Sequence, residues 1–233
     1  MADATYSLII LSAIVAGALV ARRTQSRLNL SRAQRFQLGT GAFVGAMLGA
    51  KLPFVFSDWQ GMVSGAAWFT DGKTILTGLV GGYLGVELTK WIFDIRVKTG
   101  DSFAAPVAVA VGIGRLGCYH AGCCYGTPTN LPWGVVFPAV DSLPRHPTQL
   151  YESAFHLTAA LVLMVLWSRR IWPGQLIKAY ILSYLGYRMV TEWIRPEASW
   201  LGGLTGYQWA SMVLAVVFAL LWIRDARART VPS

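Results

Sequence analysis

The sequence reads GIGRLGCYHAGCCYG over residues 112–126. This stretch holds all three cysteines of the chain, one of its three histidines and five of its glycines. It begins at the end of an apolar run, 104–113, and leads into a segment rich in glycine and proline. Because an arginine at the end of an apolar run is costly unless an anionic group meets it, we expect Arg115 to have an anionic partner.

The composition around this stretch is that of a membrane protein. Hydrophobic residues make up 55% of the chain and charged residues only 13%, whereas soluble domains carry about 25% charged residues. A membrane span needs about 20 mostly apolar residues. We therefore predict one all-α, polytopic membrane domain over residues 1–233, with about seven transmembrane helices, of which the fourth and fifth are short: Tyr6–Ala21, Leu38–Phe56, Thr74–Phe93, Phe103–Tyr119, Ser153–Trp167, Leu176–Ile194 and Tyr207–Ile223.

The basic residues orient these spans. Most of the 20 lysines and arginines follow spans one, three, five and seven, and the positive-inside rule makes that side cytoplasmic. The N-terminus is then outside and the C-terminus inside, and no basic residue precedes the first span to mark it as a signal peptide. Topology and anionic lipid account for the net charge of +9 without nucleic acid. Four arginines break the pattern on the outer side: Arg115, Arg145, Arg188 and Arg195.

Several polar and small residues inside the first three spans have structural interpretations. Lys51 and Glu87 are expected to pair with other charges, with reach toward a membrane interface as the alternative. Residues 58–72, with Trp59 and Trp68, are expected to form an outer loop or a partly inserted arm. Glycines spaced by four in spans two and three indicate close helix packing, with a groove for a lipid tail as the alternative: Gly41, Gly45 and Gly49, then Gly78, Gly81, Gly82 and Gly85.

Two polar motifs follow on the outer side. The segment 145–152 reads RHPTQLYE and enters span five. Thr148 is a candidate cap for that helix and Glu152 a candidate partner of its dipole. On span six, Tyr184, Arg188, Glu192 and Arg195 are spaced so that they share one helix face. That face is either an internal Arg188–Glu192 ion pair or a binding face on which Glu192 positions an arginine.

The motifs GRLGC (114–118), GCCYG (122–126), RHPTQLYE (145–152) and YLGYRMVTEWIRPE (184–197) together resemble the bacterial prolipoprotein diacylglyceryl transferase family. The resemblance covers roughly residues 72–222. It implies a multi-pass enzyme of the bacterial cytoplasmic (inner) membrane that moves the diacylglyceryl group of phosphatidylglycerol to the lipobox cysteine of a prolipoprotein. Glycerol phosphate leaves, and the active site faces the outer side. Besides these two substrates and membrane lipids, it implies no nucleic acid partner, cofactor or metal.

The resemblance also implies roles for residues in segments 112–152 and 184–197. Arg115 matches the essential arginine of the family's glycine-rich block, and Arg188 matches the arginine of the span-six stripe. Arginines suit this chemistry because their guanidinium forks match phosphate oxygens and stabilise charge on a departing phosphate. The substrate-binding set is Tyr184, Glu192, Arg195, Arg145, Gln149, Tyr151, Glu152 and Gly126.

The chain departs from the family in two places. Cys118 stands where the family has Asn, and Cys123, Cys124 and Tyr125 stand where it has Glu-Leu-Trp. The family's HGG segment reads Leu-Thr-Gly at 76–78, so the histidine associated with thiol activation is missing. His120 and His146 are the candidate replacements for this base, whereas His156 is expected to pack or hydrogen-bond between helices.

The cysteines leave three interpretations open. A metal site is disfavoured because adjacent cysteines chelate one ion poorly. A thiol role or a Cys118–Cys124 disulfide is the second interpretation, and small buried thiols that fill a helix interface are the third. The departures also keep two other functions open. One is a phosphatidylglycerol-dependent transferase with another acceptor or transferred group, such as phosphoglycerol onto a glycan. The other is a non-enzymatic lipid-binding membrane protein.

Overall fold

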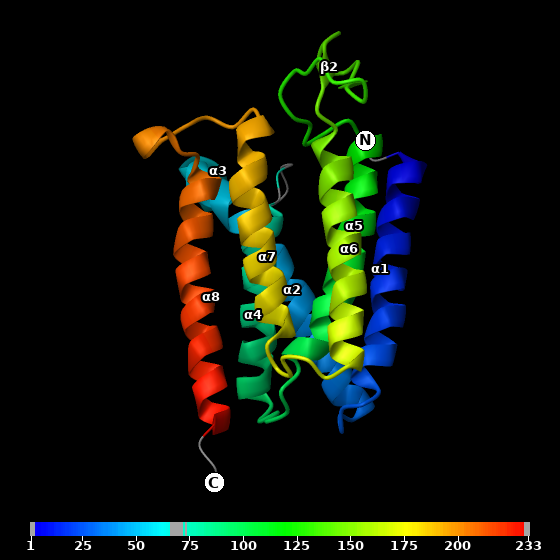
Figure 1. The fold of residues 1–233 in the computed structure, drawn as a ribbon, viewed down its shortest axis with the longest axis vertical. Coiled ribbons are helices and arrows are strands. Elements are labelled where there is room, and N and C mark those ends of the chain that lie inside the picture. Colours follow the sequence, from blue (N-terminus) through cyan, green and yellow to red (C-terminus); the bar gives the residue numbers. More distant parts are fainter. Residues whose placement is uncertain (1–2, 66–71, 73, 231–233) are drawn as a thin grey trace. The chain divides into compact units, whose positions relative to one another are not determined.

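The computed structural model describes residues 3–65, 72 and 74–230, and nearly all of its regular structure is helical (Figure 1). The main helices are α1 (Ala4–Gln25), α2 (Arg32–Ser57), α3 (Trp59–Ser64), α4 (Ile75–Ile92), α5 (Gly100–His120), α6 (Thr148–Ser168), α7 (Leu176–Thr191) and α8 (Gly206–Thr230). Two 3-10 helices, η2 (Glu192–Ile194) and η3 (Leu201–Gly203), follow α7. The predicted all-α, polytopic membrane fold is confirmed at this level.

A long helix lies at each of the seven predicted spans. Within the described residues, five are long and apolar enough to cross a membrane, namely α1, α2, α5, α6 and α8. Helix α4 has 18 residues and α7 has 16, and seven spans with a fixed orientation stay a prediction. The expectation that spans four and five are short is wrong, because α5 and α6 each extend to 21 residues through polar residues at their ends.

The chain divides into two compact units, Gln25–Thr99 and the remainder. In the first unit, α2 and α4 pack through the predicted glycines. A Cβ on Gly81 would lie 2.8 Å from the Cα of Gly49, and one on Gly45 would lie 2.9 Å from the Cα of Gly85. Only glycine permits this approach of two main chains. The close-packing interpretation of these glycines is therefore confirmed.

Three smaller predictions also fall in this unit. Glu87 pairs with Lys90 at 3.0 Å, as expected of a charge within a span. Lys51 is buried. The predicted arm after α2 contains α3, which begins at Trp59, and Trp68 and Lys73 lie outside the described residues.

The second unit comprises Met1–Thr24 and Gly100–Ser233 and holds α1, α5, α6, α7 and α8. Helices α5 and α6 lie side by side (Figure 1) and are joined where the Ser153 hydroxyl donates to the Gly112 carbonyl at 2.7 Å. At one end of this unit, Asp101 accepts from the backbone N–H of Leu176 at 2.9 Å, and Lys178 pairs with Asp225 at 2.6 Å. The polar residues of the sequence motifs lie at the opposite end.

The connection between α5 and α6 is non-helical, as its prolines and glycines predict. Its two short strands, β1 (Val135–Val136) and β2 (Pro144–Arg145), pair antiparallel. Gly126 fixes this loop against η2, which follows α7. A Cβ on Gly126 would lie 2.6 Å from the Ile194 carbonyl oxygen, and the backbone N–H of Thr127 donates to that oxygen at 2.9 Å. The loop therefore holds a defined position over the ends of α5, α6 and α7.

Candidate active site

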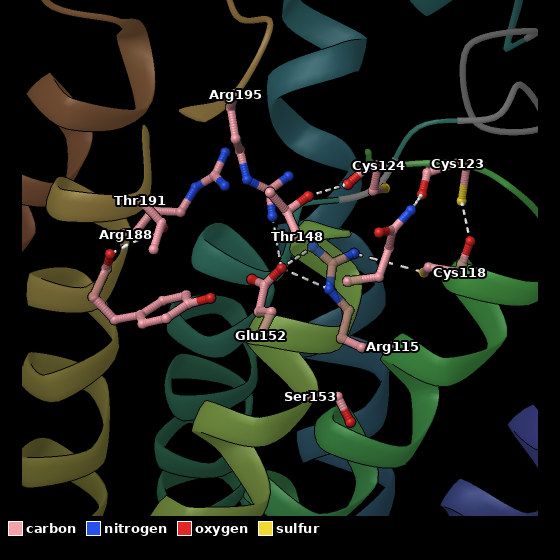
Figure 2. A network of polar contacts seen from close by, with 12 residues as sticks. Arg115, Cys118, Cys123, Cys124, Thr148, Glu152, Ser153, Arg188, Thr191 and Arg195 are labelled. Carbon is pink, nitrogen blue, oxygen red and sulfur yellow. Dashed lines mark hydrogen bonds and ion pairs between the residues drawn. The ribbon is translucent and has the colours of Figure 1, made fainter. Parts of the chain in front are cut away.

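A buried carboxylate shared by two arginines lies at the centre of the site (Figure 2). Glu152, on the second turn of α6, is fully buried. Its Oε2 accepts from Arg115 Nε at 2.7 Å and from Arg195 Nη2 at 2.7 Å, and Arg115 Nη2 makes a further contact with the same oxygen. Two arginines and one carboxylate give this cluster a formal charge of +1. The anionic partner expected for Arg115 is thus present within the chain.

The second oxygen of Glu152 also has a partner. The Tyr184 hydroxyl of α7 donates to Oε1 at 2.5 Å. The rings of Phe155, His156 and Tyr187 surround that of Tyr184, with centroid separations of 5.0 to 6.2 Å. A buried carboxylate is stable only when its oxygens are paired. Tyr184, Arg115 and Arg195 together meet this requirement, so Glu152 holds both arginines in place.

The predicted roles of Thr148 and Glu152 at the start of α6 are wrong. Thr148 is the first residue of the helix, Pro147 occupies the cap position, and no side chain caps this end. The Thr148 hydroxyl instead donates to the Cys124 carbonyl at 2.6 Å. Glu152 lies beyond the first turn and pairs with arginines. The hydrogen bond of Thr148 therefore connects the start of α6 to the loop that follows α5.

Arg188 and Glu192 form a second buried pair. Arg188 Nη2 lies 3.0 Å from Glu192 Oε2, and the Thr205 hydroxyl donates to Glu192 Oε1 at 2.8 Å. The Arg188 guanidinium also lies over the Tyr207 ring, 4.5 Å from its centroid. The predicted Arg188–Glu192 ion pair is therefore confirmed.

The prediction that Arg195 shares this helix face is wrong. Helix α7 ends at Thr191, and the chain passes through η2 into an extended conformation at Arg195, with φ −111° and ψ 147°. This break turns Arg195 toward Glu152. Arg195 Nε is buried and has no hydrogen-bond partner within the described residues.

Arg145 and Gly126 stabilise the loop between α5 and α6. Arg145 forms an ion pair with Asp141, donates from Nη1 to the Gly126 carbonyl at 3.2 Å, and lies over the Tyr125 ring at 5.1 Å. The hydrogen bonds from Arg145 hold the pKa of Asp141 below its ordinary value. These contacts connect β2 to both ends of the loop. The structure thus gives Arg145 partners within the loop.

The three histidines lie in different surroundings. His120, at the end of α5, is exposed, and its Nε2 lies 2.7 Å from Asp3 Oδ2. His146 Nδ1 lies 3.4 Å from the Tyr151 hydroxyl, which accepts from Trp133 Nε1 at 2.7 Å. His156 is fully buried, with Nδ1 2.8 Å from the Tyr180 hydroxyl. The expectation that His156 bonds between helices is therefore confirmed.

The three cysteines lie together beside the arginine cluster. Their sulfur atoms are all within 4.8 Å of one another, and Arg115 Nη1 is 3.6 Å from Cys118 Sγ. All three are free thiols, so the Cys118–Cys124 disulfide is not formed. The interpretation as buried packing thiols is wrong for Cys123 and Cys124, which are exposed. Hydrogen bonds with the Cys118 and Cys123 thiols, and the nearby Arg115 charge, lower the pKa of the Cys124 thiol.

Gln149 joins the cysteine turn to helix α6. The side chain is fully buried, and its Nε2 donates to the Cys123 carbonyl at 2.6 Å. Its Oε1 has no hydrogen-bond partner within the part of the chain that the structure describes. The family resemblance gave Gln149 a substrate-binding role, and the observed contact anchors the loop.

Sequence reasoning missed four partners of the site residues: Asp3, Trp133, Asp141 and Thr205. Asp141 precedes Arg145 by four positions, a spacing that favours ion pairs on helices, although here the pair forms in a loop. The other three lie far along the chain from their partners, and nothing in the sequence pattern marks them.

The arrangement is suited to bind an anion. Two guanidinium groups on one carboxylate keep a net positive charge, and the unpartnered Nε of Arg195 supplies a donor. Guanidinium groups match the oxygens of phosphate better than the point charge of lysine does. The second pair joins Arg188, on the last turn of α7, to Glu192, the first residue of η2.

Comparisons with known proteins give a family and several relatives that this chain resembles. The family model described as prolipoprotein diacylglyceryl transferase matches residues 3–224. A Clostridium tetani protein named phosphatidylglycerol--prolipoprotein diacylglyceryl transferase is 30% identical over 201 residues, which cover 82% of this chain and 80% of that protein. A protein of the same name from Pseudoalteromonas atlantica is 30% identical, with coverage of 84% and 73%. A third, from Nitrosospira multiformis, is 33% identical, with coverage of 75% and 60%.

Proposed function

This chain belongs to the prolipoprotein diacylglyceryl transferase family, and on that premise we propose that it transfers the diacylglyceryl group of phosphatidylglycerol to a cysteine thiol of a prolipoprotein. The bond from the glyceryl carbon to the phosphate oxygen breaks, and a bond from that carbon to sulfur forms. Glycerol phosphate leaves with the electron pair of the broken bond. The products are a thioether and an anionic leaving group.

The buried Arg195 Nε without a partner is the observation that carries this proposal. An unpaired buried donor is costly, and a phosphate oxygen of the lipid is the partner that we assign to it. Arg115, held beside it by Glu152, binds the same phosphate. As the carbon–oxygen bond breaks, negative charge grows on that phosphate, and fixed guanidinium groups in a water-poor site stabilise it.

Arg188 supplies further positive charge from the end of α7. Glu192 fixes it at 3.0 Å, and this support makes Glu192 a positioning residue in our proposal. Tyr184 has the same role toward Glu152 through its 2.5 Å hydrogen bond. Pre-positioned charges need no reorganisation during the reaction.

The thiol of the acceptor must lose a proton, because a free cysteine has a pKa of about 8.5. His146 and His120 are the two candidate bases. Asp3 orients His120 through the 2.7 Å contact at Nε2. His146 lies in the loop next to Tyr151, with Nδ1 3.4 Å from that hydroxyl. Replacing each in turn with asparagine and measuring the pH dependence of the rate identifies the base.

We place the site on the outer side of a bacterial cytoplasmic membrane, with the N-terminus outside and the C-terminus inside. Within the unit that holds the site, a group of basic residues at the helix ends lies at the end opposite to Glu152. They lie in the last turn of α1, just after α6, in the first turn of α7 and near the end of α8, and include Arg22, Arg169, Lys178 and Arg224. The positive-inside rule assigns that end to the cytoplasm.

The test is a transfer assay with purified protein in detergent. Phosphatidylglycerol labelled in its head group and a peptide with a lipobox cysteine are the substrates. We expect labelled glycerol phosphate and a peptide heavier by one diacylglyceryl group. Labelled peptide with free diacylglycerol would instead indicate phosphoglycerol transfer, and lipid binding without turnover would indicate a non-enzymatic protein.

The matched variants are Arg115→Ala, Arg188→Ala and Arg195→Ala, with Arg96→Ala as the control. Arg96 forms an exposed pair with Asp94 in the other unit, so its loss should leave turnover unchanged. If Arg115→Ala and Arg188→Ala both keep wild-type turnover, the role of the arginines in our proposal is wrong.

A further inference from the structure

The three thiols form a converging group that the proposed transfer does not use. Cys118 lies on the last turn of α5, and Cys123 and Cys124 follow in the turn after it. All three sulfur atoms lie within 4.8 Å of one another, with Cys118 half-buried and the other two exposed. Three sulfur ligands at this separation can reach a single ion through bonds of about 2.3 Å.

The backbone explains how adjacent cysteines converge. Gly122 has φ +65° and Cys124 has φ +60°. The first left-handed residue ends α5 and reverses the chain, so that the backbone N–H of Cys123 donates to the Cys118 carbonyl at 3.1 Å. The second turns Cys124 back toward Cys118. Adjacent cysteines were expected to chelate one ion poorly, but in this conformation their sulfur atoms converge with that of Cys118.

A left-handed conformation is uncommon for a residue other than glycine and is kept only where its surroundings impose it. Two buried side chains of α6 impose it here. Gln149 donates to the Cys123 carbonyl and Thr148 to the Cys124 carbonyl, both at 2.6 Å. The cysteine turn is therefore held in place before any ligand arrives.

The charge next to the thiols fits a bound thiolate group. Three thiolates around a monovalent or divalent ion carry a net negative charge. Arg115 Nη1 lies 3.6 Å from Cys118 Sγ, and Arg115 belongs to a cluster of two arginines on one glutamate with formal charge +1. The cluster offsets the negative charge of such a complex, as a nearby cation does for thiolates in general.

We propose that Cys118, Cys123 and Cys124 form a tripod that binds one soft metal ion, Cu(I) or Zn(II), through three thiolates. Soft thiolates select these ions, whereas Mg²⁺ and Ca²⁺ require oxygen ligands. Within the described residues no histidine or carboxylate joins the sulfur group. Three sulfurs complete the shell of trigonal Cu(I), whereas tetrahedral Zn(II) keeps a fourth position for water. The proposal does not rest on the proposed transfer.

Metal titration of the purified full-length protein tests the proposal. The protein is kept in detergent with a phosphine reductant, and Zn(II) or buffered Cu(I) is added in separate arms. We expect one ion per chain in at least one arm, a thiolate-to-metal absorption band, and protection of all three thiols from a thiol-reactive dye. A chelator, and not a reductant, should restore the reactivity of the thiols.

The variants Cys118→Ser, Cys123→Ser and Cys124→Ser should each weaken binding at least tenfold. His120→Asn is the control, because His120 lies two residues after Cys118 and is paired with Asp3; it should bind metal like the wild type. Circular dichroism without metal establishes that each variant is folded. Full dye reactivity at saturating metal in both arms, unchanged binding by folded Cys124→Ser, or protection that only a reductant reverses would each overturn the proposal.

Discussion

Replacing Glu152 with glutamine tests the central feature of the site. The glutamine keeps the size of the side chain and one carbonyl oxygen, so packing against α5 and α7 is preserved. In the native protein, Arg115 Nε and Arg195 Nη2 each contact the Glu152 carboxylate at 2.7 Å. The neutral amide of glutamine leaves these two arginines buried together without that negative charge. Removing one partner of a buried ion pair costs about 3–5 kcal/mol, because the remaining charge is uncompensated.

That loss corresponds to a lower unfolding temperature by about 6–20 °C, taking about 2–4 °C for each kcal/mol in a chain of this length. Thermal unfolding in detergent, followed by circular dichroism, measures it. Glu87→Gln is the matched control, since Glu87 forms a partly exposed pair with Lys90 that is worth about 0–1 kcal/mol. In the transfer assay, two displaced guanidinium groups should reduce turnover about 100-fold. Equal unfolding temperatures for the two variants would refute this reasoning, and so would wild-type turnover by Glu152→Gln.

Three further changes have defined outcomes. Arg188→Lys removes the guanidinium fork that faces Glu192 and should lower turnover tenfold to about 100-fold in the peptide assay, the worth of one charge-assisted hydrogen bond; equal rates would contradict this. Gly81→Ala places a Cβ against the Gly45 carbonyl oxygen and 2.8 Å from the Gly49 Cα and should cost about 1–3 kcal/mol. Gly39→Ala, which meets nothing within 4 Å, should be neutral or stabilising, and thermal unfolding compares the two. The pKa of Asp141 is lowered by its arginine partner, so its contribution to loop stability is present above its ordinary value of 3.8 and is lost as the pH falls below it. Hydrogen exchange of the loop should show this loss in the wild type and not in Asp141→Asn.

The positions of the helices could be predicted because each contains a long apolar run. Their ends were less well predicted, since hydropathy excludes polar residues that are nonetheless helical. Helix α6 begins at Thr148 and includes Gln149 and Glu152, whereas the apolar pattern starts at Ser153. The spacing of glycines predicted the packing of α2 on α4, because that contact depends on side-chain size alone.

The sequence predicted one buried ion pair, Arg188 with Glu192, but not the pairing of Arg115 with Glu152. Arg115 and Glu152 are separated by 37 positions, and only the packing of α5 on α6 brings them together. The helical periodicity placed Arg195 with Glu192, but the chain leaves the helix before reaching Arg195. The left-handed conformation of Cys124 could not be predicted from the sequence either, because glycine or asparagine ordinarily occupies such a position.

The end of α7 at Thr191 has a consequence for how damage spreads through the site. Had the helix continued, Arg188 and Arg195 would have drawn on one shared support. Instead each has its own carboxylate, on a different segment of the chain. A substitution that breaks the ion pair of Arg188 therefore leaves the ion pair of Arg195 intact, and the reverse also holds. The positive charge of the site is thus built with redundancy, and single losses should produce an impaired protein before they produce an inert one.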